Sequence, residues 1–293
     1  MSICLFRTEP AATPRLGLVL GDRVVDSAGA GGPATMADVL TLPAADLRTR
    51  LEAVTANGGE GIPLSAVTLV APIDRQEVWA AGVTYLRSRD ARMEESTQKS
   101  VYDLVYEADR PELFLKATPN RVSGPGEAVA VRADSTWDVP EPELAVVVNA
   151  HAEIVGYTVG NDVSSRSIEG ENPLYLPQAK VYAGACALGP GITPAWEVAD
   201  PYDLTIWMAI ERGGEVAWEG ETSTSGLKRR LEELVEYLFR EDDFPDGAII
   251  STGTALVPDS PFTLEAGDVV TIAIDQLGSL RTPVVRGKAA LRG

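Results

Sequence analysis

A series of short apolar runs between Val78 and Ile274 limits the folds open to this chain more than any other pattern. Turns rich in Gly, Pro and Asp separate the runs, and runs of this length between such turns are typical of β-strands. The pattern therefore predicts a β-rich body. Its predicted strands are Val78–Val83, Leu113–Lys116, Val129–Arg132, Leu144–Val148, Ile154–Val159, Leu204–Ile210, Ala248–Ser251 and Val269–Ile274.

The N-terminal part of the chain follows a different pattern. Three short strand-like runs (Ile3–Phe6, Leu16–Leu20 and Arg23–Asp26) precede one helical run, Ala45–Val54. A proline in Ala71-Pro72-Ile73 then marks a boundary. The 293 residues are enough for a small and a large unit. We therefore predict a small α+β domain over residues 1–72 and a larger domain over residues 73–293.

Two helical segments are predicted within the larger domain. The first covers about residues 87–109 and carries charges of both signs with few large apolar residues, which favours an exposed, mobile segment. The second covers Ser225–Arg240, where apolar residues at helical spacing favour packing of one face on the sheet. These residues are Leu227, Leu231, Leu234, Val235 and Leu238.

The charge balance argues against some classes of partner. The 25 basic and 43 acidic residues give a net charge of −18, whereas nucleic-acid binding requires a basic surface. We expect neither a nucleic-acid nor a membrane partner. No apolar stretch approaches the length that spans a bilayer, and the N-terminus lacks a long apolar core, so we expect a cytoplasmic protein.

Cysteine and histidine are scarce. Cys4 and Cys186 lie far apart in the sequence, which favours two buried, reduced thiols over a disulfide framework or a thiolate metal site. His151 is the single histidine and falls in a predicted turn. A catalytic histidine dyad or a Ser-His-Asp triad therefore has little support.

Three carboxylates lie at the ends of two consecutive predicted strands. Glu141 and Glu143 stand two apart at the head of one strand, so both point to the same face. Asp162 follows the next strand. A hairpin with its turn over residues 149–152 would place Glu141 opposite Gly160 and would bring Asp162 to the same end of the sheet.

Such a cluster predicts a metal ion. Carboxylates a few ångströms apart repel and raise one another's pKa, and a divalent cation resolves that conflict. Oxygen ligands without nearby histidine or cysteine suit a hard ion. We therefore predict that Glu141, Glu143 and Asp162 bind Mg²⁺, with Mn²⁺ or Ca²⁺ as alternatives.

Several ordered blocks from Val78 to the C-terminus resemble the fumarylacetoacetate hydrolase family. The resemblance implies a β-rich α+β fold, a mixed β-sandwich roll with a small N-terminal domain, and a homodimer or homotetramer. It also implies a metal bound by the three carboxylates and a lysine, Lys180, that faces the substrate. The blocks are Glu141-Pro-Glu-Leu-Ala-Val-Val-Val148, Gly156-Tyr-Thr-Val-Gly-Asn-Asp-Val-Ser-Ser-Arg-Ser167, Lys180, Gly189-Pro-Gly191 and Thr252-Gly-Thr254.

One departure from the family pattern bears on the reaction. Hydrolases and decarboxylases of the family usually carry Asn-Tyr-x-x-His on a segment that closes over the site, here about residues 87–110. This chain has Ser88 where that histidine is expected, which weakens the case for water activation. The closer resemblance is to the 2-keto-3-deoxypentonate dehydratases of pentose catabolism. It rests on Gly82–Arg89, Val101–Lys116 and Ser165–Lys180.

The resemblance implies a Mg²⁺-dependent hydro-lyase that converts a 2-keto-3-deoxy-D-pentonate, derived from xylonate or arabinonate, to 2,5-dioxopentanoate and water. A metal that chelates the 2-keto acid would act as a Lewis acid and stabilise the enolate. Lys180 and Glu112 are the candidate bases, and the sequence does not choose between them. The predicted substrate contacts are Tyr85, Arg87, Ser88, Arg89, Lys116, Gln178 and Thr254.

Three alternatives remain open at this point. An acylpyruvate hydrolase or oxaloacetate-type decarboxylase would use the same metal site. Lys180 could instead act as a Schiff-base nucleophile. A binding protein without chemistry would keep the fold but would not need the three carboxylates and Lys180 together.

Overall fold

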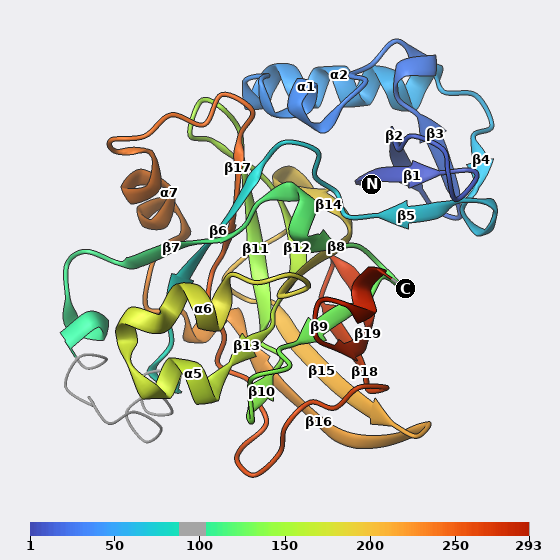
Figure 1. Cartoon of the computed structure of the whole chain (residues 1–293). Coiled ribbons are helices and arrows are strands. Elements are labelled where there is room, and N and C mark those ends of the chain that lie inside the picture. The colour runs from blue at the N-terminus through green and yellow to red at the C-terminus, as the bar shows by residue number, and fades with distance from the viewer. Residues whose placement is uncertain (88–103, 293) are drawn as a thin grey trace.

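The computed structural model describes residues 1–87 and 104–292, and β-strands form its framework (Figure 1). Most of the predicted closing segment, with Ser88 and Arg89, lies outside the described residues. The three predicted N-terminal strands are confirmed, and two further short strands join them. The N-terminal strands are β1 (Ser2–Arg7), β2 (Arg15–Leu20), β3 (Arg23–Asp26), β4 (Ile62–Pro63) and β5 (Thr68–Val70).

One large mixed sheet runs through most of the molecule. Its order is β4-β3-β2-β1-β14-β12-β11-β17-β6-β7, and β5 and β8 pair with β1 and β14. The strands β11 and β12 therefore have neighbours on both sides. The strands beyond the N-terminal part are β6 (Glu77–Gly82), β7 (Glu112–Ala117), β8 (Val122–Ser123), β11 (Pro142–Val148), β12 (Ile154–Asp162), β14 (Cys186–Pro194) and β17 (Ala248–Ser251).

A second sheet of five strands, in the order β16-β15-β18-β19-β9, packs on the large sheet. Leu144 and Val146 of β11 point into the apolar core shared with this sheet, whereas Ala145 and Val147 point to the opposite face. This alternation is the expected strand pattern. The five strands are β9 (Val129–Val131), β15 (Thr205–Arg212), β16 (Glu215–Ser223), β18 (Val269–Ile274) and β19 (Gly278–Arg286).

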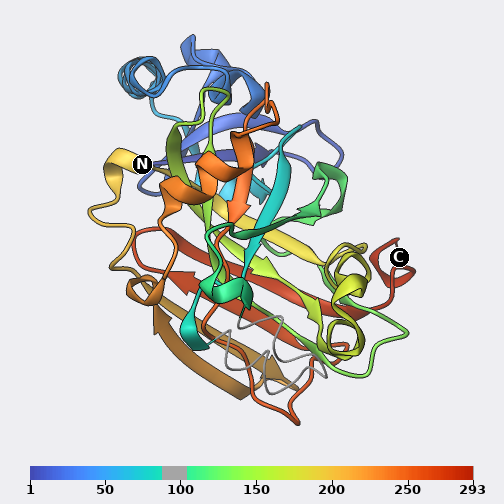
Figure 2. The ribbon, with the colours of Figure 1, turned by 90° about the vertical axis from the view of Figure 1, so that its left-hand side faces the viewer.

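Short helices cover the sheets, and α1 and α2 pack against the N-terminal strands (Figure 2). Two strands, β10 (Asp138–Val139) and β13 (Ser164–Ser165), form a small pair beside α5 and α6. Together these elements confirm the predicted β-rich α+β fold. The α-helices are α1 (Met36–Leu40), α2 (Ala44–Asn57), α5 (Arg166–Glu171), α6 (Leu176–Lys180) and α7 (Leu231–Phe239).

Two predicted elements differ in their limits. The helix expected over Ser225–Arg240 starts as a 3₁₀ turn, Thr224–Gly226, and the α-helix begins only at Leu231. The apolar face of α7 is buried as expected. The predicted domain boundary at residue 72 is crossed by strand pairing, because Ile3 of β1 pairs with Ile192 of β14. The division into two domains stays a prediction.

The predicted register of the carboxylate hairpin is wrong by two residues. Gly160 pairs with Glu143, not with Glu141. One residue of this shift comes from the turn. The turn was predicted over residues 149–152, but Asn149 and Glu153 close it in the structure. The other comes from a β-bulge, where Val147 and Val148 pair with Gly156 and Ile154. Because side chains alternate with a period of two, this even shift leaves the predicted faces unchanged.

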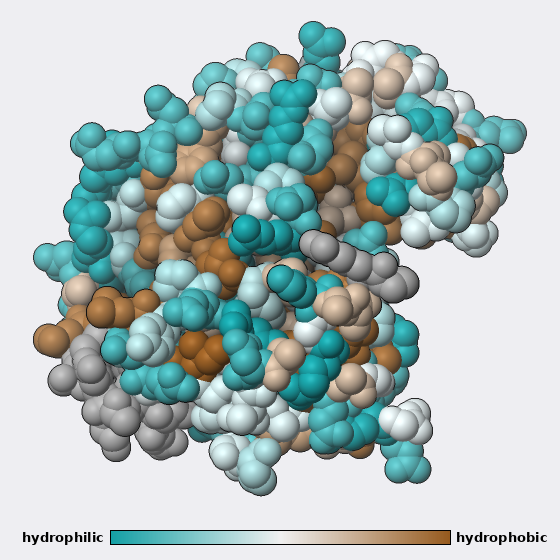
Figure 3. All heavy atoms as spheres, in the orientation of Figure 1, coloured by the Kyte–Doolittle hydropathy of each residue, from teal (hydrophilic) through white to brown (hydrophobic). Residues whose placement is uncertain are grey.

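Polar residues cover much of the face in Figure 3, and apolar residues form scattered patches on it. Within residues 1–87 and 104–292, no helix combines the length and the apolarity needed to cross a membrane. Cys4 and Cys186 are buried free thiols, as predicted. Burial raises the pKa of each thiol to about 12, so both remain protonated at neutral pH.

Candidate metal and substrate site

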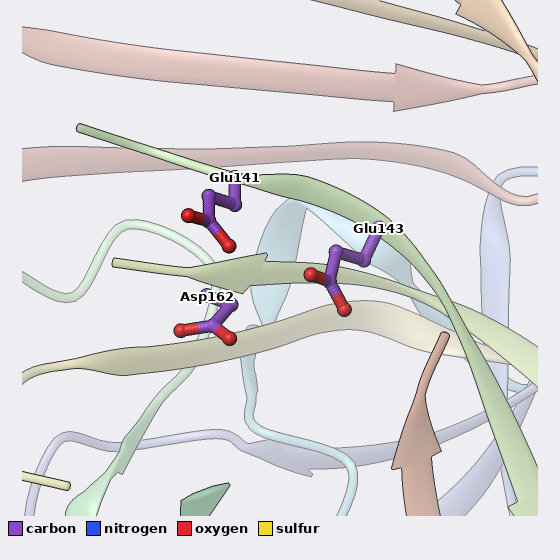
Figure 4. A group of neighbouring side chains, drawn as sticks. All are labelled: Glu141, Glu143 and Asp162. Atoms are coloured by element: carbon purple, nitrogen blue, oxygen red, sulfur yellow. The ribbon is translucent and has the colours of Figure 1, made fainter. Parts of the chain in front are cut away.

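The three predicted carboxylates converge at one end of β11 and β12 (Figure 4). Glu141 immediately precedes β11, Glu143 lies on it, and Asp162 ends β12. One oxygen from each lies within 4.8 Å of the others. All three side chains are almost fully buried, with 2–3% of each residue exposed. The predicted convergence is confirmed.

The electrostatic repulsion within the cluster affects the pKa of Glu143. Its burial, and next the charges of Asp162 and Glu141, raise the pKa of this carboxyl well above its ordinary value. Two groups oppose the shift: the nearby Lys180, and the main-chain N–H of Gly253, which donates to Oε2 of Glu143 at 2.9 Å. Gly253 has φ +88°, and a Cβ there would lie 2.1 Å from Oγ1 of Thr84. Glycine is therefore needed where this N–H turns toward the carboxylate.

Two cations contact the cluster from the helices after β13. Nζ of Lys180, at the end of α6, lies 2.6 Å from Oε2 of Glu141 and 3.2 Å from Oδ2 of Asp162, and it donates to Oγ of Ser164. Nη2 of Arg166, at the start of α5, lies 3.1 Å from Oε1 of Glu141. Because these charges are buried, their pairing offsets part of the desolvation cost.

Lys116 also contacts Asp162, through the oxygen that Lys180 does not contact. Its side chain is fully buried, and Nζ contacts Oδ1 of Asp162. The same nitrogen donates to the carbonyl oxygens of Val163 at 3.0 Å and Lys180 at 2.6 Å. Lys116 therefore contacts both a metal-ligand candidate and the chain that carries Lys180.

A small pocket, partly open to solvent, adjoins the carboxylates. Glu112 reaches it from β7, where it pairs with Gly82 of β6. A Cβ at Gly82 would lie 2.0 Å from Oε2 of Glu112, so this glycine makes room for the carboxylate. The lining residues are Ala81, Gly82, Val83, Glu112, Phe114, Glu141, Glu143, Asp162, Arg166, Glu169, Leu176, Lys180, Gly253 and Thr254.

The residues predicted to contact the substrate differ in their location and exposure. Thr254 lines the pocket. Tyr85 is buried beside it, where desolvation, and next the charge of Glu143, raise its pKa. Arg87 is exposed and pairs with Asp259 at 2.9 Å, and Gln178 is exposed on α6. The contacts predicted for these side chains stay predictions.

The sequence reasoning assigned no role to Arg166 and Glu169, although both line the pocket. They lie three apart on α5, and residues at this spacing share a helix face. Ser165 is the N-cap of α5, because its side chain accepts a hydrogen bond from the N–H of Ile168. The Ser-x-x-x-Glu pattern after a strand was the available signal for a helix that carries charge into the site.

The donor set fits a hard divalent cation. The three ligand candidates offer only carboxylate oxygens, and burial and the two neighbouring carboxylates raise the pKa of Glu143. A buried group of this kind is the environment in which Mg²⁺, Mn²⁺ or Ca²⁺ binds. The cluster can therefore hold a metal, and the pocket gives access to it from solvent.

Two curated relatives are similar in sequence to this chain over most of its length. The chain is 56% identical over 213 residues to "Probable 2-keto-3-deoxyxylonate dehydratase" of Haloferax volcanii, which covers 73% of each chain. It is 48% identical over 225 residues to 2-dehydro-3-deoxy-D-arabinonate dehydratase of Saccharolobus solfataricus, covering 75% of this chain and 76% of the relative.

A solved structure has the same fold over nearly the full length. It is described as 2-keto-3-deoxy-D-arabinonate dehydratase complexed with magnesium and 2,5-dioxopentanoate. The TM-score is 0.80 at 36% identity, with 98% of this chain and 99% of the other covered. Residues 77–285 match the model of the fumarylacetoacetate hydrolase C-terminal domain. These residues include all the candidate metal ligands, and the chain belongs to the fumarylacetoacetate hydrolase family.

Proposed function

We propose that this protein is a metal-dependent hydro-lyase that removes water from a 2-keto-3-deoxypentonate and forms 2,5-dioxopentanoate. The observation that carries the proposal is the buried cluster of Glu141, Glu143 and Asp162 with Lys180 against it, at the base of a pocket. The names of the two relatives and of the solved structure support this substrate class.

Glu141, Glu143 and Asp162 would hold the metal, which we propose to be Mg²⁺ because a magnesium complex is known for the structural neighbour. When bound, the ion supplies a Lewis acid for the carboxylate and C2 oxygens of a 2-keto acid. Lys180 and Arg166 add positive charge beside Glu141. Both cations favour the negative charge that develops on the C2 oxygen when a C3 proton is removed.

We assign the removal of the C3 proton to Glu112. Its carboxylate lines the pocket, whereas Nζ of Lys180 donates to Glu141, Asp162 and Ser164. Because Nζ of Lys180 already contacts these three acceptors, we assign it to stabilising charge and not to removing the C3 proton. Loss of the C4 hydroxyl takes up one proton and releases water. Tautomerisation then moves the new double bond toward C5 and gives the aldehyde.

The test is a turnover assay of the EDTA-treated protein on the stereoisomeric 2-keto-3-deoxypentonates, with and without added Mg²⁺. We expect Mg²⁺-dependent formation of 2,5-dioxopentanoate, detected with an aldehyde reagent. Glu141→Ala should lose both Mg²⁺ binding and turnover. Pyruvate release from acylpyruvates, without any dehydration of the pentonates, would overturn the proposal and favour a hydrolase.

The setting of the enzyme follows from the same proposal. A 2-keto-3-deoxypentonate is an intermediate of pentose breakdown, so we place the protein in the cytoplasm in that role. We further propose a homodimer or homotetramer, the assembly that the family resemblance implies.

A further inference from the structure

Lys116 is the extra residue of a β-bulge beneath the carboxylate cluster. Ala117 pairs with Val78 of the neighbouring strand and Leu115 pairs with Trp79, so Lys116 has no partner in this register. Bulges next to active sites re-aim side chains. Simple alternation along β7 would put Lys116 on the face of Glu112, but Glu112 lines the pocket and Lys116 does not.

All the hydrogen-bonding capacity of this ammonium is used inside the protein. A lysine has three N–H donors, and Nζ of Lys116 has three acceptors: Oδ1 of Asp162 and the carbonyl oxygens of Val163 and Lys180. The side chain is fully buried, and Lys116 is not among the residues that line the pocket. No donor is therefore left for a substrate.

The two carboxylate oxygens of Asp162 have different contacts. Oδ1 contacts Lys116 and accepts a hydrogen bond from Oγ of Ser164 at 3.3 Å, whereas Oδ2 lies 3.2 Å from Nζ of Lys180, which lines the pocket. Lys116 also holds the main-chain carbonyl of Lys180, the residue whose side chain contacts Glu141 and Asp162. The buried ammonium of Lys116 therefore fixes both Asp162, a candidate metal ligand, and the end of α6, which carries Lys180.

We propose that Lys116 is a positioning residue that orients Asp162 for metal binding, so that only Oδ2 is presented to the cation. The inference rests on the metal site of the proposed function, but not on its reaction. It replaces the direct substrate contact that the sequence suggested for Lys116. Groups that orient metal ligands in this way typically contribute about 10–100-fold to metal affinity or activity.

Lys116→Met tests the proposal, because methionine keeps an unbranched chain of similar length without the charge. We expect Mn²⁺ to bind about 10–100-fold more weakly, as measured by calorimetry or by the electron paramagnetic resonance signal of free Mn²⁺ without substrate. Lys116→Gln retains two neutral N–H donors without the charge and should lie between the wild type and Lys116→Met. Unchanged Mn²⁺ affinity in folded Lys116→Met would overturn the proposal.

Arg212→Met is the control for removing the cationic partner of a buried carboxylate elsewhere. Nε of Arg212 lies 2.7 Å from Oδ1 of Asp268, whose side chain is fully buried, in the five-stranded sheet. This variant should lower the stability while leaving the Mn²⁺ affinity unchanged. An equal loss of Mn²⁺ affinity in both variants would mean that general destabilisation, not Lys116, sets the affinity.

A double variant covers the case in which Lys116→Met does not fold. If Lys116 acts on the carboxylate, the defect arises from the unpaired charge of Asp162, and Asp162→Asn should relieve it in the double variant. A defect that persists would overturn the proposal and leave Lys116 as a support of the main chain. Because the readouts are Mn²⁺ binding and folding, a failure of the dehydratase assay does not affect this test.

Discussion

The charges at the site are divided unequally among its carboxylates. Lys116 and Lys180 contact Asp162, and Lys180 and Arg166 contact Glu141. Glu143 instead receives the main-chain N–H of Gly253. Burial, and next the charges of Asp162 and Glu141, raise the pKa of Glu143, and this N–H and Lys180 oppose the shift only in part. A cation bound beside Glu143 would offset the repulsion among the three carboxylates.

Glu143→Gln should stabilise the metal-free protein at neutral pH and weaken Mg²⁺ binding. The folded pKa of Glu143 is raised above its ordinary value of 4.5, so the folded state holds the proton more tightly than the unfolded state. Stability from this group is full below pH 4.5 and is lost as the pH rises through the raised pKa. The loss is about 1.4 kcal/mol for each tenfold difference in proton affinity.

Urea unfolding in EDTA between pH 4 and pH 9 measures the effect. Glu143→Gln should remove a fall in stability that the wild type shows, whereas Glu215→Gln, on the exposed edge strand β16, should retain it. Parallel pH profiles for the wild type and Glu143→Gln would contradict the prediction.

At the scale of elements, the pairing of β6 and β7 positions the proposed base. Gly82 and Glu112 are partners in the register, and the carboxylate of Glu112 occupies the space where a side chain at position 82 would stand. The carboxylate of the proposed base can occupy this position because the neighbouring strand has a glycine at position 82. No pattern within either strand alone indicates this.

Gly82→Ala should lower kcat by about 100-fold, because misplacing a reacting group by about 1 Å can cost that much. The added methyl lies 2.0 Å from Oε2 of Glu112 and must displace this flexible carboxylate. Stability should change little, since the side chain can move. Gly29→Ala is the control, with its nearest atom 3.6 Å away. A Gly82→Ala enzyme with wild-type kcat would exclude Glu112 as the base in this position.

The sequence predicted the strands better than it predicted their alignment. Apolar runs mark β11 and β12, and the Glu-x-Glu spacing placed Glu141 and Glu143 on one face. Gly156 lies at the hairpin bulge and was an available signal for it, whereas the bulge at Lys116 has no adjacent glycine or proline. Bulges depend on contacts with neighbouring strands, so the register and the place of Lys116 required the structure.

At the scale of the whole molecule, the N-terminal part holds the turn of the carboxylate hairpin. Nδ2 of Asn149 donates to the carbonyl of Leu42 at 2.9 Å and to Oε2 of Glu153 at 2.7 Å. The N–H of Ala150 donates to the carbonyl of Leu40 at 2.8 Å. The family match starts at residue 77, yet residues before it bind the turn that joins β11 to β12.

Asn149→Ala should lower the free energy of unfolding by about 1–3 kcal/mol, because buried partners lose their hydrogen bonds. Asn149 is fully buried. The Mn²⁺ affinity should stay unchanged, since the turn lies at the opposite end of the strands from the carboxylates. Urea unfolding measures the loss, with exposed Asn57→Ala as the control. Equal unfolding midpoints for both variants would contradict this role of the turn.

The bulged hairpin also restricts how its length can change during evolution. Pairing the two strands without the bulge would shift β12 by one residue and reverse its faces beyond the bulge. Asn161 would then take the place of Asp162, and the carboxylate would point to the opposite face of the sheet. A change of one residue within the paired parts of β11 and β12 is therefore compatible with the site only where a bulge or a second change restores the register.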